Sequence, residues 1–380
     1  MLRRAAETLA FAAGALFAVA ECCAAGHALA VGPDATNALA LAMTAEYSFA
    51  SNGCGGIAYS GRDGRFFVLQ DHAGDGFARV HPLSLEIDPD TGAILSQSLG
   101  PSFVPARLRN SEGIAYDPRM GTLWICDEGT PPSIAEFLVD GKATGRTAPI
   151  SALLRGKPRY NLSLESLTIS PDGLTMWTAN EQALKCDGGS SSGNTNVNTV
   201  VRLTRYRRGA AKAGWAAAGE WAYSCDKCAG TACAQSGLSG LCALPDGSLL
   251  ALEREVSIET CGRCRIYRIT TGALAAATEV SGIPALTNAT YAAVAKGDPL
   301  VSFTGPRPSG ILGPYELIVY EGIALGPRLN DGSYSVYLVS DGGESVSKKV
   351  GPFTVTATAA SRICALRLSG LPTASSPKAK

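Results

Sequence analysis

The sequence is poor in histidine and has no excess of charge of either sign. It contains 3 histidines among 380 residues, and Lys plus Arg and Asp plus Glu both number 33. The missing basic excess argues against nucleic acid and anionic lipid as partners. A Ser-His-Asp triad would have to use His72 or His81, and the Arg-His-Gly signature of histidine acid phosphatases is absent. The composition therefore disfavours hydrolases that depend on histidine.

Long stretches with helical periodicity are also missing from the chain after its first 30 residues. This absence argues against α/β barrels and Rossmann folds. The chain is 46% hydrophobic and 17% charged, so it can bury a substantial core, and its length suits one large β domain or two ordinary ones. We therefore expect an all-β protein.

The N-terminal segment resembles a secretory signal. Two arginines precede an apolar run at 9–20, and a small-x-small site predicts cleavage after Ala30. The alternative is a lipoprotein modified at Cys22 or Cys23, although Glu21 fits that pattern poorly. The apolar run is too short to cross a membrane. We expect residues 1–30 to be a signal peptide and the remaining chain to be a secreted monomer, extracellular or periplasmic.

Ten of the 12 cysteines follow the predicted signal. An even number in an exported chain predicts disulfides. The spacing of Cys225, Cys228, Cys261 and Cys264 is also compatible with a four-thiolate zinc site. The export signal and the additional Cys233 favour a disulfide-braced fold.

One pattern occurs five times along the chain. Each copy has a short apolar strand, a turn rich in Pro, Asp and Gly, a second apolar strand and a polar end, which predicts a β-hairpin. The copies are GGIAYSGRDGRFFVLQD from Gly55, EGIAYDPRMGTLWICDE from Glu112, ESLTISPDGLTMWTANE from Glu165, SGLCALPDGSLLALERE from Ser239 and EGIALGPRLNDGSYSVYLVSD from Glu321.

The repeats predict a β-propeller. The first two intervals are roughly 55 residues, close to the length of a four-stranded blade. The longer last interval leaves room for a degenerate blade using 291–303, so we expect six blades, five of them with clear hairpins. Residues 39–49 are predicted to close the ring beside the C-terminal strands. The propeller domain is expected to span 31–370, followed by a flexible tail, 371–380.

In a propeller, the start of each inner strand and the end of its hairpin partner lie at one mouth of the central channel. The repeat therefore predicts a cluster of polar residues there. The first positions are Gly55, Glu112, Glu165, Ser239 and Glu321. The second-strand ends are Asp71, Asp127 with Glu128, Asn180 with Glu181, Glu253 with Arg254, and Asp341.

Several carboxylates at one mouth need a counter-ion. Two carboxylates about 5 Å apart repel by roughly 3 kcal/mol at an effective dielectric constant near 20. A divalent cation held by oxygens would neutralise them, and the lack of histidine favours calcium over zinc. We expect Glu112, Glu165 and Glu321 as inner ligands, with Asp127, Asn180 and Asp341 as further candidates. Alternatively, each acid caps a turn or pairs with a neighbouring arginine.

The motifs SEGIAYDP, LESLTISPDG, LSGLCALPDG with LALER, and YEGIALGPRLNDG followed by LVSDGG resemble the phytase-like family described as "esterase-like activity of phytase". The resemblance covers about residues 50–345. It implies a secreted β-propeller whose repeated acids carry a phosphoester-cleaving activity. The hairpins are also similar to those of calcium-dependent lactonases of the gluconolactonase type. Ser239, where the other motifs have an acid, departs from the pattern.

The resemblance together with the predicted cation leads us to expect a metal-dependent phosphoric ester hydrolase acting on a small molecule. A bound cation would polarise phosphoryl oxygens, and Arg254 would bind a phosphate oxygen. Glu128 or Glu181 would accept a proton from the attacking water. Arg254 is equally interpretable as an ion-pair partner of Glu181 or Glu253. A non-catalytic binding propeller with a structural cation and a lactone hydrolase are the alternative functions.

Overall fold

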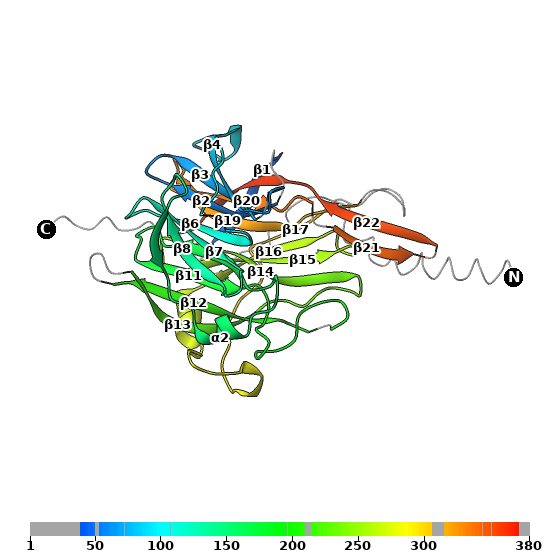
Figure 1. Cartoon of the computed structure of the whole chain (residues 1–380). Coiled ribbons are helices and arrows are strands. Elements are labelled where there is room, and N and C mark those ends of the chain that lie inside the picture. Colours follow the sequence, from blue (N-terminus) through cyan, green and yellow to red (C-terminus); the bar gives the residue numbers. More distant parts are fainter. Residues whose placement is uncertain are drawn as a thin grey trace.

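The computed structural model describes residues 39–49, 53–71, 73–106, 108–195, 197–209, 214–305, 315–343, 345–350 and 352–371. Regular structure in this part of the chain is almost entirely β-strand (Figure 1). The predicted signal peptide and all but the first residue of the predicted tail lie outside the described residues. Both therefore stay predictions.

Five four-stranded antiparallel sheets form the blades of a propeller. Blade 1 contains β2 (Cys54–Ser60), β3 (Arg65–Gln70), β4 (Arg79–Ile87) and β5 (Ile94–Leu99). Blade 2 contains β6 (Ser111–Asp117), β7 (Thr122–Asp127), β8 (Ser133–Phe137) and β9 (Ala143–Thr147). Blade 3 contains β10 (Leu164–Ile169), β11 (Thr175–Asn180), β12 (Val200–Arg208) and β13 (Trp215–Ser224). Blade 4 contains β14 (Cys233–Ala243), β15 (Leu249–Ser257), β16 (Arg263–Ile269) and β17 (Val301–Thr304).

Blade 5 joins the two ends of the described chain. It contains β19 (Tyr320–Arg328), β20 (Tyr334–Ser340), β23 (Arg362–Ser369) and β1 (Ala40–Ser48), in that order from the channel outwards. β1 pairs antiparallel with β23, from Ala40 opposite Ser369 to Ser48 opposite Arg362. The predicted closure of the ring by residues 39–49 is confirmed.

The ring closes with five blades. The inner strands β2, β6, β10, β14 and β19 each contact the next, and β19 contacts β2. The all-β propeller prediction is confirmed, but the sixth blade expected from 291–303 is wrong for the described residues. Its last residues enter β17, the outermost strand of blade 4.

The long interval before β19 is instead filled by an irregular segment. It contains α3 (Thr271–Ala276) and η1 (Leu286–Asn288), while the other described helix, α2 (Ala152–Gly156), follows blade 2. The segment satisfies part of its backbone against β13, because Val280 N donates to Glu220 O at 2.7 Å and Val294 N donates to Ala222 O at 2.8 Å. Extra chain length therefore covers the outside of blade 3. Neither α2 nor α3 has the length and apolarity needed to cross a membrane.

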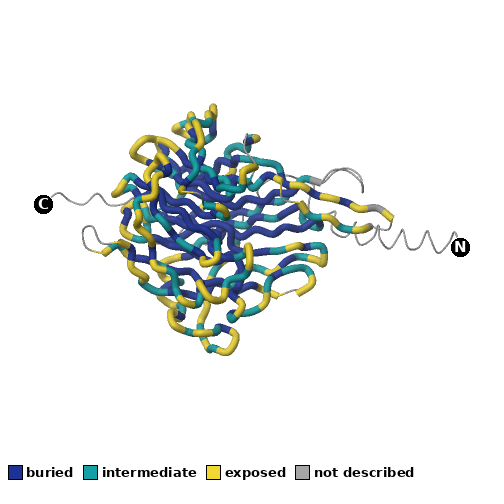
Figure 2. Tube along the Cα trace, in the orientation of Figure 1, coloured by how far each residue is buried: buried dark blue, intermediate teal, exposed yellow. Residues whose placement is uncertain are grey.

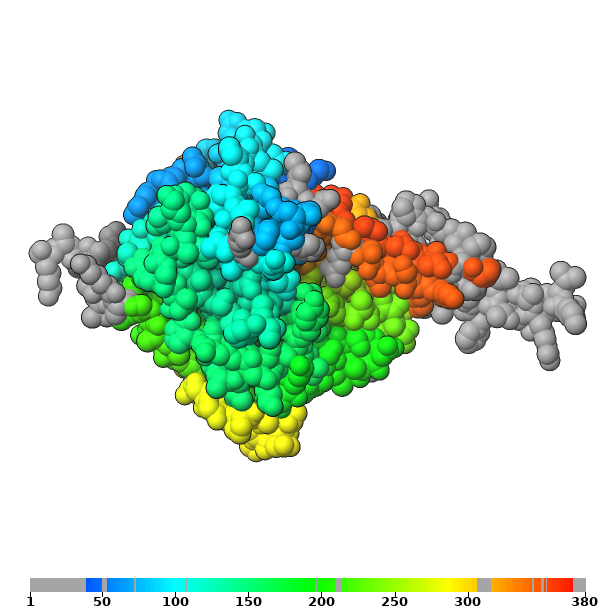
Figure 3. Space-filling model, in the orientation of Figure 1, coloured from blue at the N-terminus to red at the C-terminus, as the bar shows by residue number. Residues whose placement is uncertain are grey.

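A sixth, three-stranded sheet lies outside the ring. It contains β18 (Tyr315–Leu317), β22 (Phe353–Ala359) and β21 (Ser345–Val350). Val355 and Ala357 of β22 pack with Val256 of β15 and the adjacent Ile258. The β21–β22 hairpin projects from the body of the molecule, as the orange-red segment in Figure 3 shows. It follows directly after Gly342 and Gly343, which line the cavity described below.

Burial decreases from the channel to the periphery (Figure 2). Every residue of β6 and β7 is buried, whereas four of the five residues in β9 are exposed. Inner strands are covered on both faces by neighbouring blades, which explains their nearly continuous apolar sequences. The outer strands carry most of the polar residues.

Glycine permits the close packing of the inner strands. A Cβ on Gly113 would lie 2.7 Å from Leu167 N on β10. Gly56, Gly240 and Gly322 occupy the same step of their strands, and a Cβ on any of them would also lie within 3 Å of the neighbouring inner strand. At this step glycine therefore permits the close approach of the inner strands in blades 1, 2, 4 and 5, whereas blade 3 has Ser166 there.

Candidate functional site

Each first-position residue of the repeat lies at a β-bulge. The register of the inner strand shifts at Gly55, Glu165, Ser239 and Glu321, and at Glu112 together with Gly113. A bulge bends the strand and redirects the extra side chain. Five bulges at equivalent steps therefore set the direction of the side chains at one end of the channel, here called the mouth.

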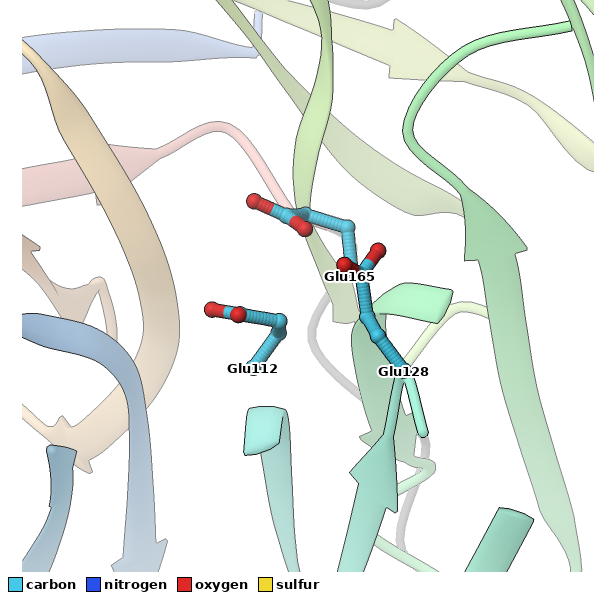
Figure 4. Close-up of side chains that lie close together, drawn as sticks. All are labelled: Glu112, Glu128 and Glu165. Atoms are coloured by element: carbon cyan, nitrogen blue, oxygen red, sulfur yellow. The ribbon is translucent and has the colours of Figure 1, made fainter. Parts of the chain in front are cut away.

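Three glutamates meet at the mouth. Glu112 lies on β6, Glu128 directly follows β7, and Glu165 lies on β10 (Figure 4). One carboxylate oxygen of each lies within 4.8 Å of those of the other two. All three side chains are buried. The structure therefore brings together Glu112 and Glu165, both predicted as ligands, with Glu128, which was predicted as a catalytic base.

Glu321 reaches the same region from blade 5. A Cβ on Gly55 would lie 2.9 Å from Glu112 Oε2 and 3.6 Å from Glu321 Oε2. Glycine at the first position of blade 1 thus leaves space for the carboxylates of blades 2 and 5. Ser239 in blade 4 differs, because its buried hydroxyl lies 3.2 Å from Tyr320 O and donates to backbone rather than facing the glutamates.

Arg254, at the end of the fourth hairpin, is the counter-ion for part of this cluster. Its Nε and Nη2 donate to Glu181 Oε1 at 3.1 and 3.0 Å, and Nη2 lies 3.4 Å from Glu165 Oε1. Its Nη1 donates to Glu321 Oε1. The interpretation of Arg254 as an ion-pair partner of Glu181 is confirmed, whereas Glu253 pairs with Lys296.

Glu128 is fixed by the loops before β6 and β10. Its Oε1 accepts from Ser163 N, and its Oε2 accepts from Asn110 Nδ2 at 3.2 Å. Burial, followed by the charges of Glu165 and Glu181, raises the pKa of Glu128 to about 10. Burial, followed by the charge of Glu128, also raises the pKa of Glu112 well above its usual value. Arg254 acts in the opposite direction on both but does not compensate the whole cluster.

Two predicted ligands bind backbone groups instead of facing the cluster. Asp127 Oδ1 accepts from Gly129 N at 2.8 Å, and its Oδ2 accepts from Ser111 Oγ at 3.1 Å and from two further backbone N–H groups. Asn180 Oδ1 accepts from Arg202 N at 2.9 Å. These contacts hold loops around the mouth, and the predicted ligand roles of Asp127 and Asn180 stay predictions.

A cavity of about 450 Å³ opens above the glutamates. Its lining includes Glu112, Glu165, Glu321, Arg254 and Asp341 from the predicted site. Glu181 is completely buried behind Arg254 and does not line it. The structure therefore collects most of the predicted polar residues around one accessible space.

Sequence reasoning missed the amide side chains at the rim of this cavity. Gln70, Asn110, Asn161 and Gln235 line it, one from each of blades 1 to 4 or the loop before the blade. Asn110, Asn161 and Gln235 precede the first position of their repeats, the last two by four residues each, and so lie outside the aligned hairpins. Gln70 lies inside the first hairpin, directly before Asp71. Asn161 has a positive φ of 53°, a conformation that Asn tolerates better than most residues.

The donor set fits a hard divalent cation. The three converging side chains offer carboxylate oxygens, the ligands that calcium and magnesium prefer. The cluster is also more acidic than one guanidinium can neutralise. Glu112 and Glu165 could hold the ion, with Glu128 beside them, and Glu321 and Asp341 line the cavity at the same place.

The cysteines do not form the alternative zinc site. Cys228 and Cys233 are joined by the one disulfide found in the described residues, so Cys228 is not a thiolate ligand. Buried thiols remain at Cys126, Cys225, Cys242, Cys264 and Cys364. The disulfide prediction is thus confirmed for one pair, and the other positions mainly fill the core.

The opposite end of the channel has different chemistry. A cavity of about 230 Å³ there is lined by the later residues of the inner strands, including Ile57, Ile114, Leu167 and Ile323. No acidic or basic residue lines it within the described part of the chain. The charged groups of the channel are therefore concentrated at the mouth.

Comparisons with known proteins agree with a family assignment. The family model "Phytase-like: Esterase-like activity of phytase" matches residues 50–342, and no curated protein matches the chain. The periplasmic gluconolactonase of Pseudomonas aeruginosa is 11% identical, with a TM-score of 0.36 and 86% of this chain and 90% of that chain covered. A chain of a nidogen/laminin complex is 12% identical, with a TM-score of 0.36 and coverages of 84% and 97%. These two structural similarities are too low to bear on function.

Proposed function

Because the chain belongs to the phytase-like family described as "esterase-like activity of phytase", we propose that it is a calcium-dependent phosphoric ester hydrolase acting at the channel mouth. The observation that carries the proposal is the convergence of Glu112, Glu128 and Glu165 within 4.8 Å below an accessible cavity. Carboxylates this close and this buried need a cation to remain ionised together.

The residues of the mouth have different roles in this proposal. Glu112, Glu165 and Glu321 would hold the cation, and Asp341 would contribute from the cavity wall. When bound, the cation would polarise a phosphoryl oxygen and lower the pKa of a water molecule. Arg254 lines the cavity, so its guanidinium would contact a second phosphoryl oxygen while keeping Glu181 and Glu321 in position.

Hydrolysis transfers the oxygen of water to phosphorus as the bond from phosphorus to the alcohol oxygen breaks. One proton of that water would pass to Glu128, which the Asn110 amide and the Ser163 backbone hold beside Glu112 and Glu165. Glu181 is the alternative acceptor predicted from sequence, but its burial behind Arg254 makes it less accessible to water. The proton is finally returned to the leaving alkoxide, so the products are an alcohol and phosphate.

The same proposal places the protein in an oxidising compartment. The Cys228–Cys233 disulfide supports an extracellular or periplasmic location, where such bonds persist. An extracellular location also suits a calcium-dependent enzyme, because calcium-binding modules outside the cell function with weak calcium affinity.

The test compares Glu112→Gln with Glu86→Gln in purified protein. Glu86 is exposed on β4 and bonds Ser96, so its variant controls for the chemical change alone. Metal content and phosphate release from phytate and from simple mono- and diesters would be measured with calcium and with excess chelator. We expect Glu112→Gln to lose about 100-fold or more in kcat/KM, because it removes a ligand from the centre that stabilises transition-state charge.

Full activity of Glu112→Gln, or activity in excess chelator, would overturn the metal-centred mechanism. Calcium binding without turnover of any ester would favour a non-catalytic propeller in which Arg254 and the cation are structural. Turnover of lactones with no turnover of phosphate esters would instead favour the lactonase alternative.

A further inference from the structure

The rim of the mouth carries side chains suited to hydroxyl groups. Gln70, Asn110, Asn161 and Gln235 line the cavity, and they come from four successive blades. An amide both donates and accepts hydrogen bonds, as an alcohol does. Four amides around one cavity therefore match a ligand with several hydroxyls arranged around a ring.

The contacts of these amides leave capacity for a ligand. Asn110 Nδ2 donates to Asn161 Oδ1 at 3.1 Å as well as to Glu128, which orients both asparagines at the rim. Asn161 Nδ2 and the amide group of Gln235 make no hydrogen bond to another described residue. Gln70 Oε1 lies 3.1 Å from His81 Nε2, which fixes its amide. The rim is thus partly preorganised and partly available.

The charge of the cavity limits what can enter. Its described lining contains Asp71, Glu112, Glu165, Glu321 and Asp341, whereas Arg254 is the one basic residue among them. Arg254 is already paired with three glutamates. Even with one bound divalent cation, the described lining keeps a net negative charge. A single phosphoryl group can be accommodated at the cation, but each additional phosphate would be repelled by the carboxylates of the lining.

We propose that the cavity selects a sugar or cyclitol carrying a single phosphoryl group and excludes polyphosphorylated polyols such as phytate. The inference rests on the proposed function for the position of the phosphoryl group. The amide rim would bind the hydroxyls of the ring, while the acidic wall, through Asp71 and Asp341, repels further phosphates. Specificity of this kind comes from unfavourable contacts with the wrong ligand as much as from good contacts with the right one.

Binding can be measured independently of turnover. Isothermal titration with myo-inositol monophosphate, myo-inositol hexakisphosphate and phenyl phosphate would be done with free calcium held constant by a calcium buffer, because phytate itself sequesters calcium. Ionic strength would be fixed near 0.15 M, since salt screens the repulsion. We expect the hexakisphosphate to bind at least about tenfold more weakly than the monophosphate.

Two variants separate the charge from the amide contribution. Asp71→Asn should reduce the ratio of the dissociation constants of the hexakisphosphate and the monophosphate by about threefold. Asp140→Asn, at an exposed turn remote in sequence from the rim, should leave this ratio unchanged. Gln235→Ala should weaken the binding of inositol monophosphate about fivefold, because one hydrogen bond is lost, and should leave the binding of phenyl phosphate unchanged. Gln97→Ala is its control, because Gln97 is exposed on β5 and bonds Ser48 O.

Each outcome bears on one of the two proposals. If the binding order holds but no ester is hydrolysed, the proposed function fails and the ligand class stands. If esters are hydrolysed but the hexakisphosphate binds as tightly as the monophosphate, or tighter, the ligand class is overturned and the proposed function stands. If Gln235→Ala weakens the binding of phenyl phosphate and of inositol monophosphate equally, the proposal that the rim recognises hydroxyl groups is also overturned.

Discussion

The two ends of the central channel are built from the same five inner strands but have opposite chemistry. At the mouth, Glu112, Glu165 and Glu321 meet around a polar cavity. At the opposite end, two or three residues further along the same strands, Ile114 and its counterparts line a smaller apolar cavity. Between them lies the step at which the inner strands of blades 1, 2, 4 and 5 carry a closely packed glycine.

The difference separates stability from function along one strand. Apolar side chains at the far end gain free energy by burial and need no partner. Carboxylates at the mouth lose hydration and repel one another, so they persist only with counter-ions. The apolar far end therefore stabilises the fold, whereas the carboxylates of the mouth destabilise it. This cost indicates that the carboxylates serve the function of the protein and not its stability.

Replacing Arg254 tests the mouth and should give the largest change in stability. Arg254→Met removes the counter-ion of Glu165, Glu181 and Glu321 and leaves buried carboxylates uncompensated. We expect the free energy of unfolding in chelator to fall by about 4 kcal/mol. Calcium should restore more stability to this variant than to the original protein, because more negative charge remains for it to neutralise.

Urea denaturation with chelator and with calcium would measure both effects. Arg65→Met is the matched control, since Arg65 is exposed at the start of β3 and has no ion pair within the described residues. A loss below about 1 kcal/mol in Arg254→Met would contradict its assignment as the internal counter-ion.

Shortening Ile114 tests the apolar end. Ile114 is 3% exposed and packs with residues of blades 1 and 2, so Ile114→Ala leaves a cavity that the close-packed ring cannot refill. We expect a loss of about 3 kcal/mol in the free energy of unfolding and no change in calcium affinity. Leu95→Ala, on exposed β5, should change stability by less than about 0.5 kcal/mol. Calcium affinity that falls together with the stability of Ile114→Ala would show that the two ends are coupled.

The repeated hairpins were predictable because they are local. Alternating apolar strands and Pro-Asp-Gly turns identify both strands of all five hairpins, and shared spacing identifies the propeller. The blade number was not predictable in the same way. The segment after Ile269 is long enough for a blade, but the backbone N–H groups of Val280 and Val294 donate hydrogen bonds to blade 3. These are tertiary contacts, which no local sequence pattern encodes.

The acidic mouth was predictable to the level of its repeated positions. Glu112, Glu165 and Glu321 cluster because equivalent steps of a ring lie together. The pairing of Arg254 and the inward position of Glu128 depend on where each hairpin ends, and the backbone contacts of Asn180 depend on β12. Of the rim amides, Asn110 and Asn161 lie in the loops before their blades, and Gln235 lies on β14 ahead of the first position of the repeat. Such residues become recognisable only after the blades are placed in space.

Replacing Ser239 should give the smallest effect and tests whether every first position serves the mouth. Ser239 is the neutral member of the repeat, and its hydroxyl lies 3.3 Å from Leu252 O and 3.2 Å from Tyr320 O. Ser239→Ala should cost about 1 kcal/mol, the value of one buried hydrogen bond, and leave calcium affinity unchanged. Ser96→Ala, which removes an exposed hydroxyl bonded to Glu86, is the control and should cost less. If Ser239→Ala instead weakens calcium binding as much as Glu112→Gln does, blade 4 contributes a ligand from its inner strand, and the contrast between its neutral first position and the acids of blades 2, 3 and 5 disappears.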